Sequence, residues 1–217
     1  DELGVERWTL LAALDDAIRQ SFGVVAPHER PAASIVVYDS VQRVVWRVGD
    51  CPFRVGGVPY NQGKQIDRVT ADFRAAVLAA SGIYSFEEDL GRAAIEPLLR
   101  LQGRFANKVG KFGYGVIDGQ AVPEEFIEVV EVPGDVEELV LASDGYPTLP
   151  RTLAEAEAEL VVLEVGVCPL SRFSLSQLYI CDLGHLCGIH PFTVTGKLED
   201  AAQHNVLAID GLGAWCL

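Results

Sequence analysis

The chain has 217 residues, of which 49% are hydrophobic and 22% are charged. This length fits one domain or two small ones, and this composition supports a sizeable core, which excludes disorder along the whole chain. The formal net charge of −14 argues against binding of nucleic-acid backbone and suits carboxylate clusters that bind cations.

The first half of the chain predicts a helix followed by strands. Residues 5–22 carry apolar side chains on one helical face, and Gly23 follows as a stop signal. Residues 34–39 and 44–48 are rich in β-branched residues and predict a hairpin. Residues 53–57 continue the sheet and end in a Gly-Gly turn.

The middle of the chain predicts two helices and a second hairpin. Residues 66–80 have a helical period. Ser85 with Glu88 resembles a capping box that opens a helix from 86 to about 105, which Pro97 should kink or divide. Residues 112–122 predict a hairpin that turns at Asp118-Gly119.

Two further strands and a helix follow. Residues 126–132 alternate as a strand does, and residues 138–142 are a strand that runs into Ser-Asp-Gly. Thr152, with a glutamate three residues later, caps a helix over 152–163. From about residue 161 the sequence is atypical, because charged residues become fewer and the hydrophobic periodicity weakens. Residues 206–209 again predict a strand.

Three of these strands end in an acid followed by a turn, at Asp50, Asp144 and Asp210. Each acid alone is more simply explained as a turn residue, since Asp-Gly turns are common. Together they suggest a sheet edge where carboxylates converge around a bound cation. Oxygen ligands select Mg²⁺ or Mn²⁺, and two such ions can activate a water and hold a phosphoryl group.

The segments Val48-Gly-Asp-Cys51 and Leu139-Val-Leu-Ala-Ser-Asp-Gly145, with the helix after them, resemble the metal-dependent serine/threonine protein phosphatases of the 2C type. The resemblance runs from about residue 34 to 160. It implies two antiparallel sheets between helices, with a dinuclear Mg²⁺ or Mn²⁺ centre. It also implies that Asp144 ligates the catalytic metals and that Asp50 helps at a neighbouring or third metal position.

The opening motif of that family has its match at the wrong end of this chain. Residues 206–213, ending in Asp210-Gly211-Leu-Gly, resemble the family's strand with the bridging aspartate, and Glu199-Asp200 precede them. Read as a circular permutation, Asp210 is the bridging ligand, Gly211 offers its carbonyl, and Glu199 or Asp200 is a further acid. The alternative is that this quarter is unrelated sequence. Asp182 is the poor candidate for the family's closing aspartate.

A second metal candidate lies in the same C-terminal part. Two thiols and two imidazoles fall within one short glycine-containing loop, which are ligand types that zinc prefers, although their spacing fits no standard zinc template. They are Cys181, His185, Cys187 and His190.

The sequence therefore predicts an α+β protein: one phosphatase-like domain over 1–217, an α-β-β-α sandwich of two mainly antiparallel sheets flanked by helices. Asp144 and Asp210 would be catalytic, and a metal-bound hydroxide would attack the phosphorus of a phosphorylated protein or small phosphoester. The alternatives are a catalytically degenerate binding or regulatory module, and a fragment with a zinc site in its tail.

The expected location is the cytoplasm. No apolar run approaches the roughly 20 residues of a membrane span, and the first residues lack the pattern of a signal peptide. The five cysteines are odd in number and unevenly spaced, which favours thiols in a reducing compartment over a disulfide framework. We therefore expect neither a membrane nor a nucleic acid as a partner.

Overall fold

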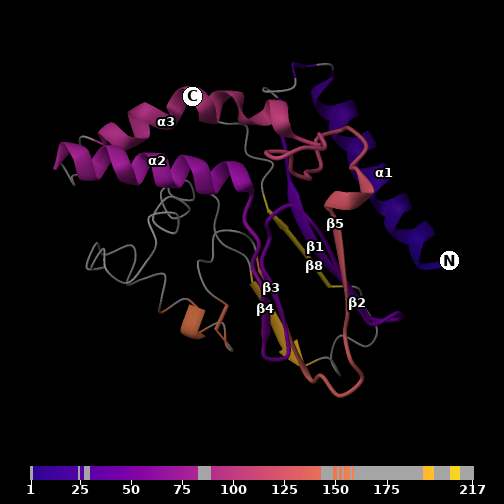
Figure 1. Ribbon diagram of the computed structural model, residues 1–217. Coiled ribbons are helices and arrows are strands. Elements are labelled where there is room, and N and C mark those ends of the chain that lie inside the picture. Colours follow the sequence, from indigo (N-terminus) through magenta and orange to yellow (C-terminus); the bar gives the residue numbers. More distant parts are fainter. Residues whose placement is uncertain are drawn as a thin grey trace.

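A computed structural model describes most of the first 142 residues and isolated parts of the rest. The described residues are 2–23, 25–26, 30–82, 89–142, 149–150, 152, 154–156, 158, 193–197 and 206–210. They form helices and two antiparallel sheets of four strands each, which confirms the α+β class. Figure 1 shows the strands running side by side below a pair of helices.

The first sheet has the strand order β5-β2-β1-β8. The β1–β2 hairpin is the predicted one, and the Asp39 side chain closes it by accepting from the backbone N–H groups of Val41 and Gln42 at 2.9 and 3.0 Å. The strands of this sheet are β1 (Ser34–Asp39), β2 (Val44–Val48), β5 (Ile127–Glu131) and β8 (Val206–Asp210).

The second sheet has the order β4-β3-β6-β7. The strands β5 and β6 follow one another in the chain but belong to different sheets, so the turn at Pro133 carries the chain from one sheet to the other. The strands of this sheet are β3 (Phe53–Val55), β4 (Val58–Tyr60), β6 (Glu138–Ala142) and β7 (Thr193–Lys197).

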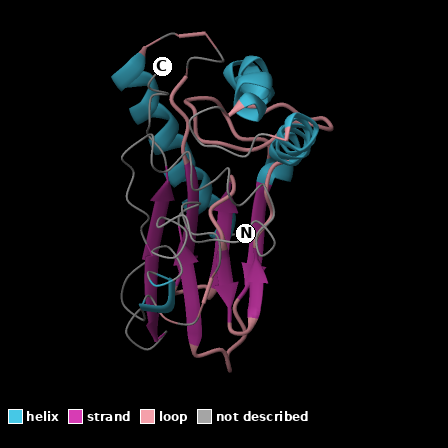
Figure 2. Ribbon diagram, turned by 90° about the vertical axis from the view of Figure 1, so that its left-hand side faces the viewer, coloured by secondary structure: helices cyan, strands magenta, loops and turns pink. Residues whose placement is uncertain are grey.

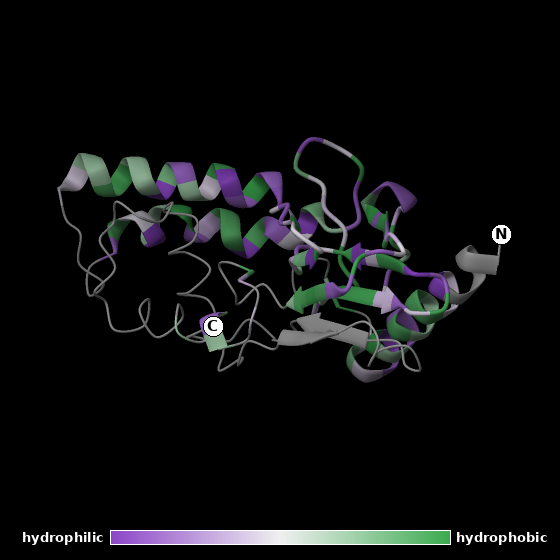
Figure 3. Cartoon of the chain, turned by 90° about the horizontal axis from the view of Figure 1, so that it is seen from below, coloured by the Kyte–Doolittle hydropathy of each residue, from purple (hydrophilic) through white to green (hydrophobic). Residues whose placement is uncertain are grey.

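The main core lies between the two sheets. Val36 and Val45 of the first sheet pack in one cluster with Phe53, Leu139 and Leu141 of the second. These residues alternate with others along their strands, as expected where successive side chains point to opposite faces. Figure 3 shows hydrophobic colouring along the strands that are not drawn in grey.

Helix α1 (Glu2–Phe22) covers the opposite face of the first sheet. Leu11 and Ile18 pack there against Ile35, Val37 and Trp46, so β1 and β2 are buried on both faces. The helix ends as predicted, and the Gly23 N–H donates to the carbonyl of Arg19 at 2.9 Å. This gives three successive layers of helix, sheet and sheet.

Helices α2 (Gln65–Ser81) and α3 (Leu90–Leu101) pack mainly against one another. In Figures 1 and 2 the pair lies across the upper end of the sheets and projects away from them. The buried guanidinium of Arg74 joins the two helices through an ion pair with Asp89. Within the described part of the chain, the pair therefore lies at the end of the sheets and does not form the outer layer expected over the second sheet.

The helix predicted from 86 to about 105 is present as α3, and the proposed capping residues Ser85 and Glu88 lie outside the described residues. The Asp89 carboxylate is the N-cap of α3, accepting from the Arg92 N–H at 2.7 Å, and the helix begins at Leu90. Pro97 does not divide α3, which continues to Leu101 and then tightens into a 3₁₀ turn, η1 (Gln102–Phe105).

The segment predicted as a hairpin over 112–122 is a loop. Its backbone makes only single bridges, one between Ile117 and Ala33 and one between Tyr114 and Ala106. A second 3₁₀ turn, η2 (Glu124–Phe126), then leads into β5. The loop is held by side-chain contacts described below, which the local pattern does not encode.

The later part of the chain contributes strands to both sheets. The predicted cap at Thr152 is confirmed, because its hydroxyl accepts from the Glu155 N–H at 3.2 Å and the Glu155 carboxylate accepts from the Thr152 N–H at 3.1 Å. The strand predicted at 206–209 is β8. Across the described ranges, no helix has both the length and the apolar character needed to cross a membrane.

Candidate functional site

The carboxyl ends of β2, β6 and β8 lie at the same end of the two sheets. β1 begins where β2 and β8 end, with Ile35 opposite Val48 and Ser34 opposite Asp210. In the second sheet, the Ala142 N–H at the end of β6 donates to the carbonyl of Pro52 at 3.0 Å. We call this end of the two sheets the strand-end rim; α2 begins there, at the upper end in Figure 1.

Ser34 links two of the three strand ends. Its backbone pairs with Asp210, and its hydroxyl lies 2.6 Å from Oδ1 of Asp50, to which it donates. Asp50 follows β2 directly and stands two residues before Pro52, the partner of β6. The backbone therefore brings the ends of β2 and β8 together and places the end of β6 beside the segment that follows Asp50.

Gly49 allows this close approach. Its φ of +91° lies in the region that favours glycine, and a Cβ atom there would stand 2.2 Å from the Ser34 hydroxyl oxygen. Any side chain at this position would displace Ser34. The geometry of the strand end thus requires a glycine directly after β2.

Asp50 forms a half-buried ion pair with Lys64. The ammonium nitrogen lies 2.7 Å from Oδ2 of Asp50, and the two side chains are 18% and 15% exposed. Burial alone would raise the pKa of the Asp50 carboxyl, but the Lys64 charge and the hydrogen bonds from Lys64 and Ser34 hold it below its usual value. Burial would lower the pKa of Lys64, yet Asp50 and Asp67 raise it, so both groups are charged at neutral pH.

A second acid and a tyrosine complete the surroundings of Lys64. Its ammonium lies 5.1 Å from the ring centroid of Tyr114, within cation–π range. Burial raises the pKa of the Tyr114 phenol to about 12, and its hydroxyl donates to the Gln102 carbonyl at 3.2 Å. The Gln102 side-chain amide donates to Asp67 at 2.7 Å, and burial raises the pKa of that carboxyl.

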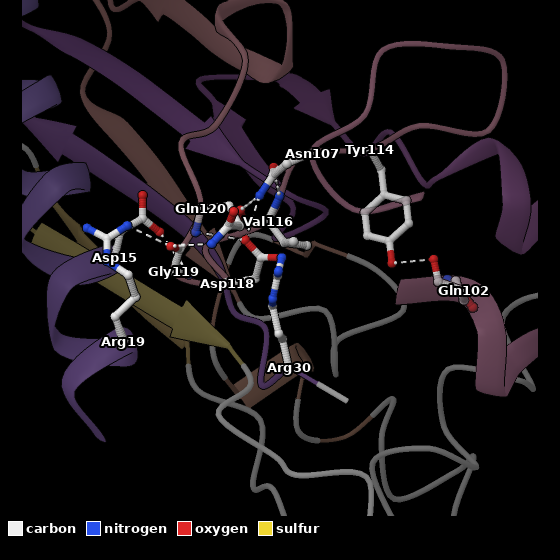
Figure 4. A network of polar contacts seen from close by, with 10 residues as sticks. All are labelled: Asp15, Arg19, Arg30, Gln102, Asn107, Tyr114, Val116, Asp118, Gly119 and Gln120. Carbon is white, nitrogen blue, oxygen red and sulfur yellow. Dashed lines mark hydrogen bonds and ion pairs between the residues drawn. The ribbon is translucent and has the colours of Figure 1, made fainter. Parts of the chain in front are cut away.

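The loop that carries Tyr114 is fixed by a buried aspartate (Figure 4). Oδ1 of Asp118 accepts from the Asn107 amide at 2.9 Å and from the Gln120 N–H at 3.1 Å. Its Oδ2 lies 3.5 Å from the Arg30 guanidinium. Asp118 is therefore an internal acceptor that holds the loop together, and not the tip of a hairpin.

Helix α1 holds the same loop through the peptide of Gly119. The Asp15 carboxylate accepts from the Gly119 N–H at 3.1 Å, and the Arg19 guanidinium donates to the Gly119 carbonyl at 2.7 Å (Figure 4). Burial, with a smaller contribution from Asp118, raises the pKa of Asp15 to about 6. The loop thus contacts α1 through Gly119 and Lys64 through Tyr114.

The donor set around Asp50 does not fit a metal ion. Both carboxylate oxygens accept from protein donors, and the Lys64 ammonium stands where it would repel a divalent cation. The Asp67 carboxylate already accepts from Gln102. Among the residues that the structure describes, no group of three or more His, Cys, Asp or Glu side chains is placed to hold a metal ion.

The other predicted site residues are described only in part or not at all. Asp210 ends β8, and the structure describes its backbone alone. The remaining predicted site residues lie outside the described residues. They are the metal ligands Asp144 and Gly211, the further acids Asp182, Glu199 and Asp200, and the zinc ligands Cys181, His185, Cys187 and His190.

Sequence reasoning missed Lys64 and its partners, although Lys64 carries one signal. A lysine at the amino end of a helix opposes the helix dipole and replaces the usual capping side chain, so it indicates a partner elsewhere in the fold. Ser34, Tyr114 and Gln102 carry no comparable signal, because their roles depend on which strands and loops meet.

The fold defines a protein of helices and two facing antiparallel sheets, with polar side chains gathered at one end of them. Searches of protein-family models, of curated proteins and of solved structures found no match to this chain.

Proposed function

We propose that this protein is a metal-dependent hydrolase of phosphoesters whose site lies at the strand-end rim. The observation that carries the proposal is the meeting of strand ends there: β8 ends in Asp210 opposite Ser34, and β6 ends two residues before Asp144 beside Pro52. Acids on neighbouring strand ends can share a divalent cation.

Asp144 and Asp210 are the acids to which we assign Mn²⁺ or Mg²⁺, with Gly211 as a further ligand. A cation in this position supplies positive charge to the phosphoryl oxygens and lowers the pKa of water. The protein's own contribution is to hold the ends of β6 and β8, which precede or carry these acids, on two rigid sheets. The substrate is a phosphorylated protein or a small phosphoester, and the cytoplasm, where the buried Cys51 thiol would stay reduced, is the proposed location.

The test is hydrolysis of an aryl phosphate by the purified chain. We expect turnover with added Mn²⁺ or Mg²⁺, none with EDTA, and a loss of at least about 100-fold in Asp144→Asn and in Asp210→Asn. Asp135→Asn is the matched control, because Asp135 is an exposed aspartate in the turn after β5, at the opposite end of the sheets. Undiminished turnover in both rim variants, with the fold intact by circular dichroism, excludes the proposal.

A second candidate function is binding without turnover, and the Lys64–Asp50 ion pair favours it. A protein cation already neutralises one acid of the rim, as expected of a site that has lost part of its metal set. Binding of a phosphopeptide that is unaffected by EDTA, together with absent hydrolysis, would support this module.

Zinc in the tail remains the third proposal, with Cys181, His185, Cys187 and His190 as ligands. Metal analysis of protein purified without added zinc tests it. Zinc at one equivalent, lost in Cys181→Ser, is the expected result, and the absence of zinc excludes the site.

A further inference from the structure

The half-buried polar cluster at the strand-end rim has an unusual charge composition. Asp50 and Asp67 are two carboxylates that interact with the same ammonium, that of Lys64. With both acids ionised the three groups sum to one negative charge, and without Lys64 they would sum to two. Two carboxylates in a half-buried site without a cation are unfavourable, so the fold needs a positive charge at this point.

Lys64 is fixed in place as a bound ion would be. Its ammonium lies 2.7 Å from Asp50, the Tyr114 ring covers another side at 5.1 Å, and only 18% of its side chain is exposed. The second oxygen of Asp50 is held by the Ser34 hydroxyl at 2.6 Å. The direct contacts come from Asp50 after β2 and from Tyr114 in the loop of residues 106–122, and Ser34 of β1 holds Asp50, so three separate elements define the position of one charge.

We infer that the ammonium of Lys64 replaces a metal ion beside Asp50, so that Asp50 positions Lys64 and does not ligate a metal. The inference concerns the same rim as the proposed function but does not require catalysis. It means that the protein itself neutralises the Asp50 side of the rim.

Binding of Mn²⁺ by calorimetry to four forms of the full chain tests the inference. The forms are the parent, Asp50→Asn, Lys64→Met and the double variant. We expect Asp50→Asn to change any Mn²⁺ affinity of the parent by less than about twofold, because Asp50 is not a ligand. Lys64→Met should gain a Mn²⁺-binding event that the double variant lacks, because the two acids lose their counter-ion.

Two results would overturn the inference. One is a loss of tenfold or more in Mn²⁺ affinity in Asp50→Asn while Lys64 is present. The other is a Lys64→Met variant that binds no more Mn²⁺ than the double variant. Failure of the proposed function looks different: the parent then binds no Mn²⁺ and hydrolyses nothing, while the Lys64→Met comparison still gives its answer.

A measurement on the parent chain covers the case in which Lys64→Met does not fold. The ¹⁵N resonance of the Lys64 ammonium and the ¹³C resonance of the Asp50 carboxylate can be assigned with Asp50→Asn as the reference. We expect both signals to persist unchanged in saturating Mg²⁺. Loss of the ammonium signal together with a shift of the carboxylate signal would mean that Mg²⁺ displaces Lys64, which contradicts the inference.

Discussion

At the scale of single residues, the strand-end rim depends on contacts that tolerate little change. Ser34 pairs with Asp210 through its backbone and with Asp50 through its hydroxyl, and Gly49 leaves the space for both. The local sequence predicted the acid after β2 correctly as a strand-end residue. It could not predict Lys64 as the partner, because that contact requires β3, β4 and the start of α2 to bring residue 64 back to residue 50.

Replacing Gly49 by alanine should destabilise the fold by about 3 kcal/mol, since a Cβ at φ +91° adds backbone strain to a collision with Ser34. Two controls separate these causes. Gly82 has a positive φ of 66° but no atom within 4 Å of a Cβ placed there, so Gly82→Ala should cost about 1 kcal/mol. A Cβ at Gly57 would also have no atom within 4 Å, and this residue lacks a positive φ, so Gly57→Ala should change stability by less than about 0.5 kcal/mol. Urea unfolding measures all three, and equal costs for Gly49→Ala and Gly82→Ala would contradict the collision.

Asp15 should make the stability of the fold depend on pH. Its pKa is raised to about 6 in the folded protein, above its ordinary value of 3.8, so the folded state binds the proton more tightly. The contribution of the protonated Asp15 carboxyl to the free energy of unfolding is fully present below pH 4 and is lost as the pH rises through about 6. Asp15→Asn should remove this pH dependence, so the stability of the variant relative to that of the parent should rise by roughly 2 to 3 kcal/mol between low pH and pH 7.

The measurement for Asp15 is the free energy of unfolding in urea at several pH values between 4 and 8. Asp16→Asn is the matched control, because Asp16 is the next residue but is more than half exposed. A pH profile of Asp15→Asn parallel to that of the parent would show that the buried carboxyl is not titrating in this range.

At the scale of elements, the first turn of α3 depends on the side chain of Asp89, which has two roles. Asp89 caps the helix by accepting from the Arg92 N–H and pairs with the buried Arg74 of α2. The sequence predicted a capping box at Ser85 and Glu88, which lie outside the described residues, and gave no sign of the role of Asp89. The tertiary partner Arg74 explains why the helix begins at Leu90, and such a partner is invisible to a pattern of neighbouring residues.

Substitutions at Asp89 should separate these two roles. Asp89→Ala should destabilise the protein by about 3 kcal/mol, because it removes the cap and leaves a buried guanidinium without this carboxylate. Asp89→Asn keeps a capping oxygen and loses only the charge, so it should cost about 2 kcal/mol or less. Thermal unfolding followed by circular dichroism measures both variants, and equal losses would mean that the cap contributes nothing.

The conformation of the loop of residues 106–122 could not be predicted from the local sequence pattern. Asp118-Gly119 between apolar runs is a strong local hairpin signal. In the fold, Asp118 is only 4% exposed and accepts from Asn107 and Gln120, while Ile117 bridges to Ala33. These contacts join residues far apart in the sequence, and they override the local preference of the dipeptide.

At the scale of the whole molecule, the α+β class and the β1–β2 hairpin follow from hydrophobic periodicity, which the buried strands retain. The division of the strands between two sheets does not follow from it. β5 and β6 are joined by a short turn that reads as a hairpin, yet each pairs with a different sheet. The sides on which β7 and β8 attach likewise depend on the packing of the complete fold.

Deletion of residues 161–217 should remove the folded state, because β7 pairs along all of β6 and β8 pairs along β1. The truncated chain would expose two hydrophobic strand edges, which favours aggregation. Deletion of residues 211–217 is the matched control, because it keeps both strands. Size-exclusion chromatography and circular dichroism compare the two, and a monomeric, cooperatively folded 1–160 fragment would contradict this account.

The late position of β7 and β8 has a consequence for how the protein is made. Because the chain is synthesised from its N-terminus, β1 leaves the ribosome about 170 residues before β8, its neighbour at the edge of the sheet. Likewise, β6 leaves the ribosome about 50 residues before β7. During that interval each sheet lacks an edge strand, and β1 and β6 are open to pairing with other nascent chains. Slow translation of the segment between β6 and β7 would lengthen this interval, so the yield of native protein should depend on elongation rate and on chaperones that bind extended apolar segments.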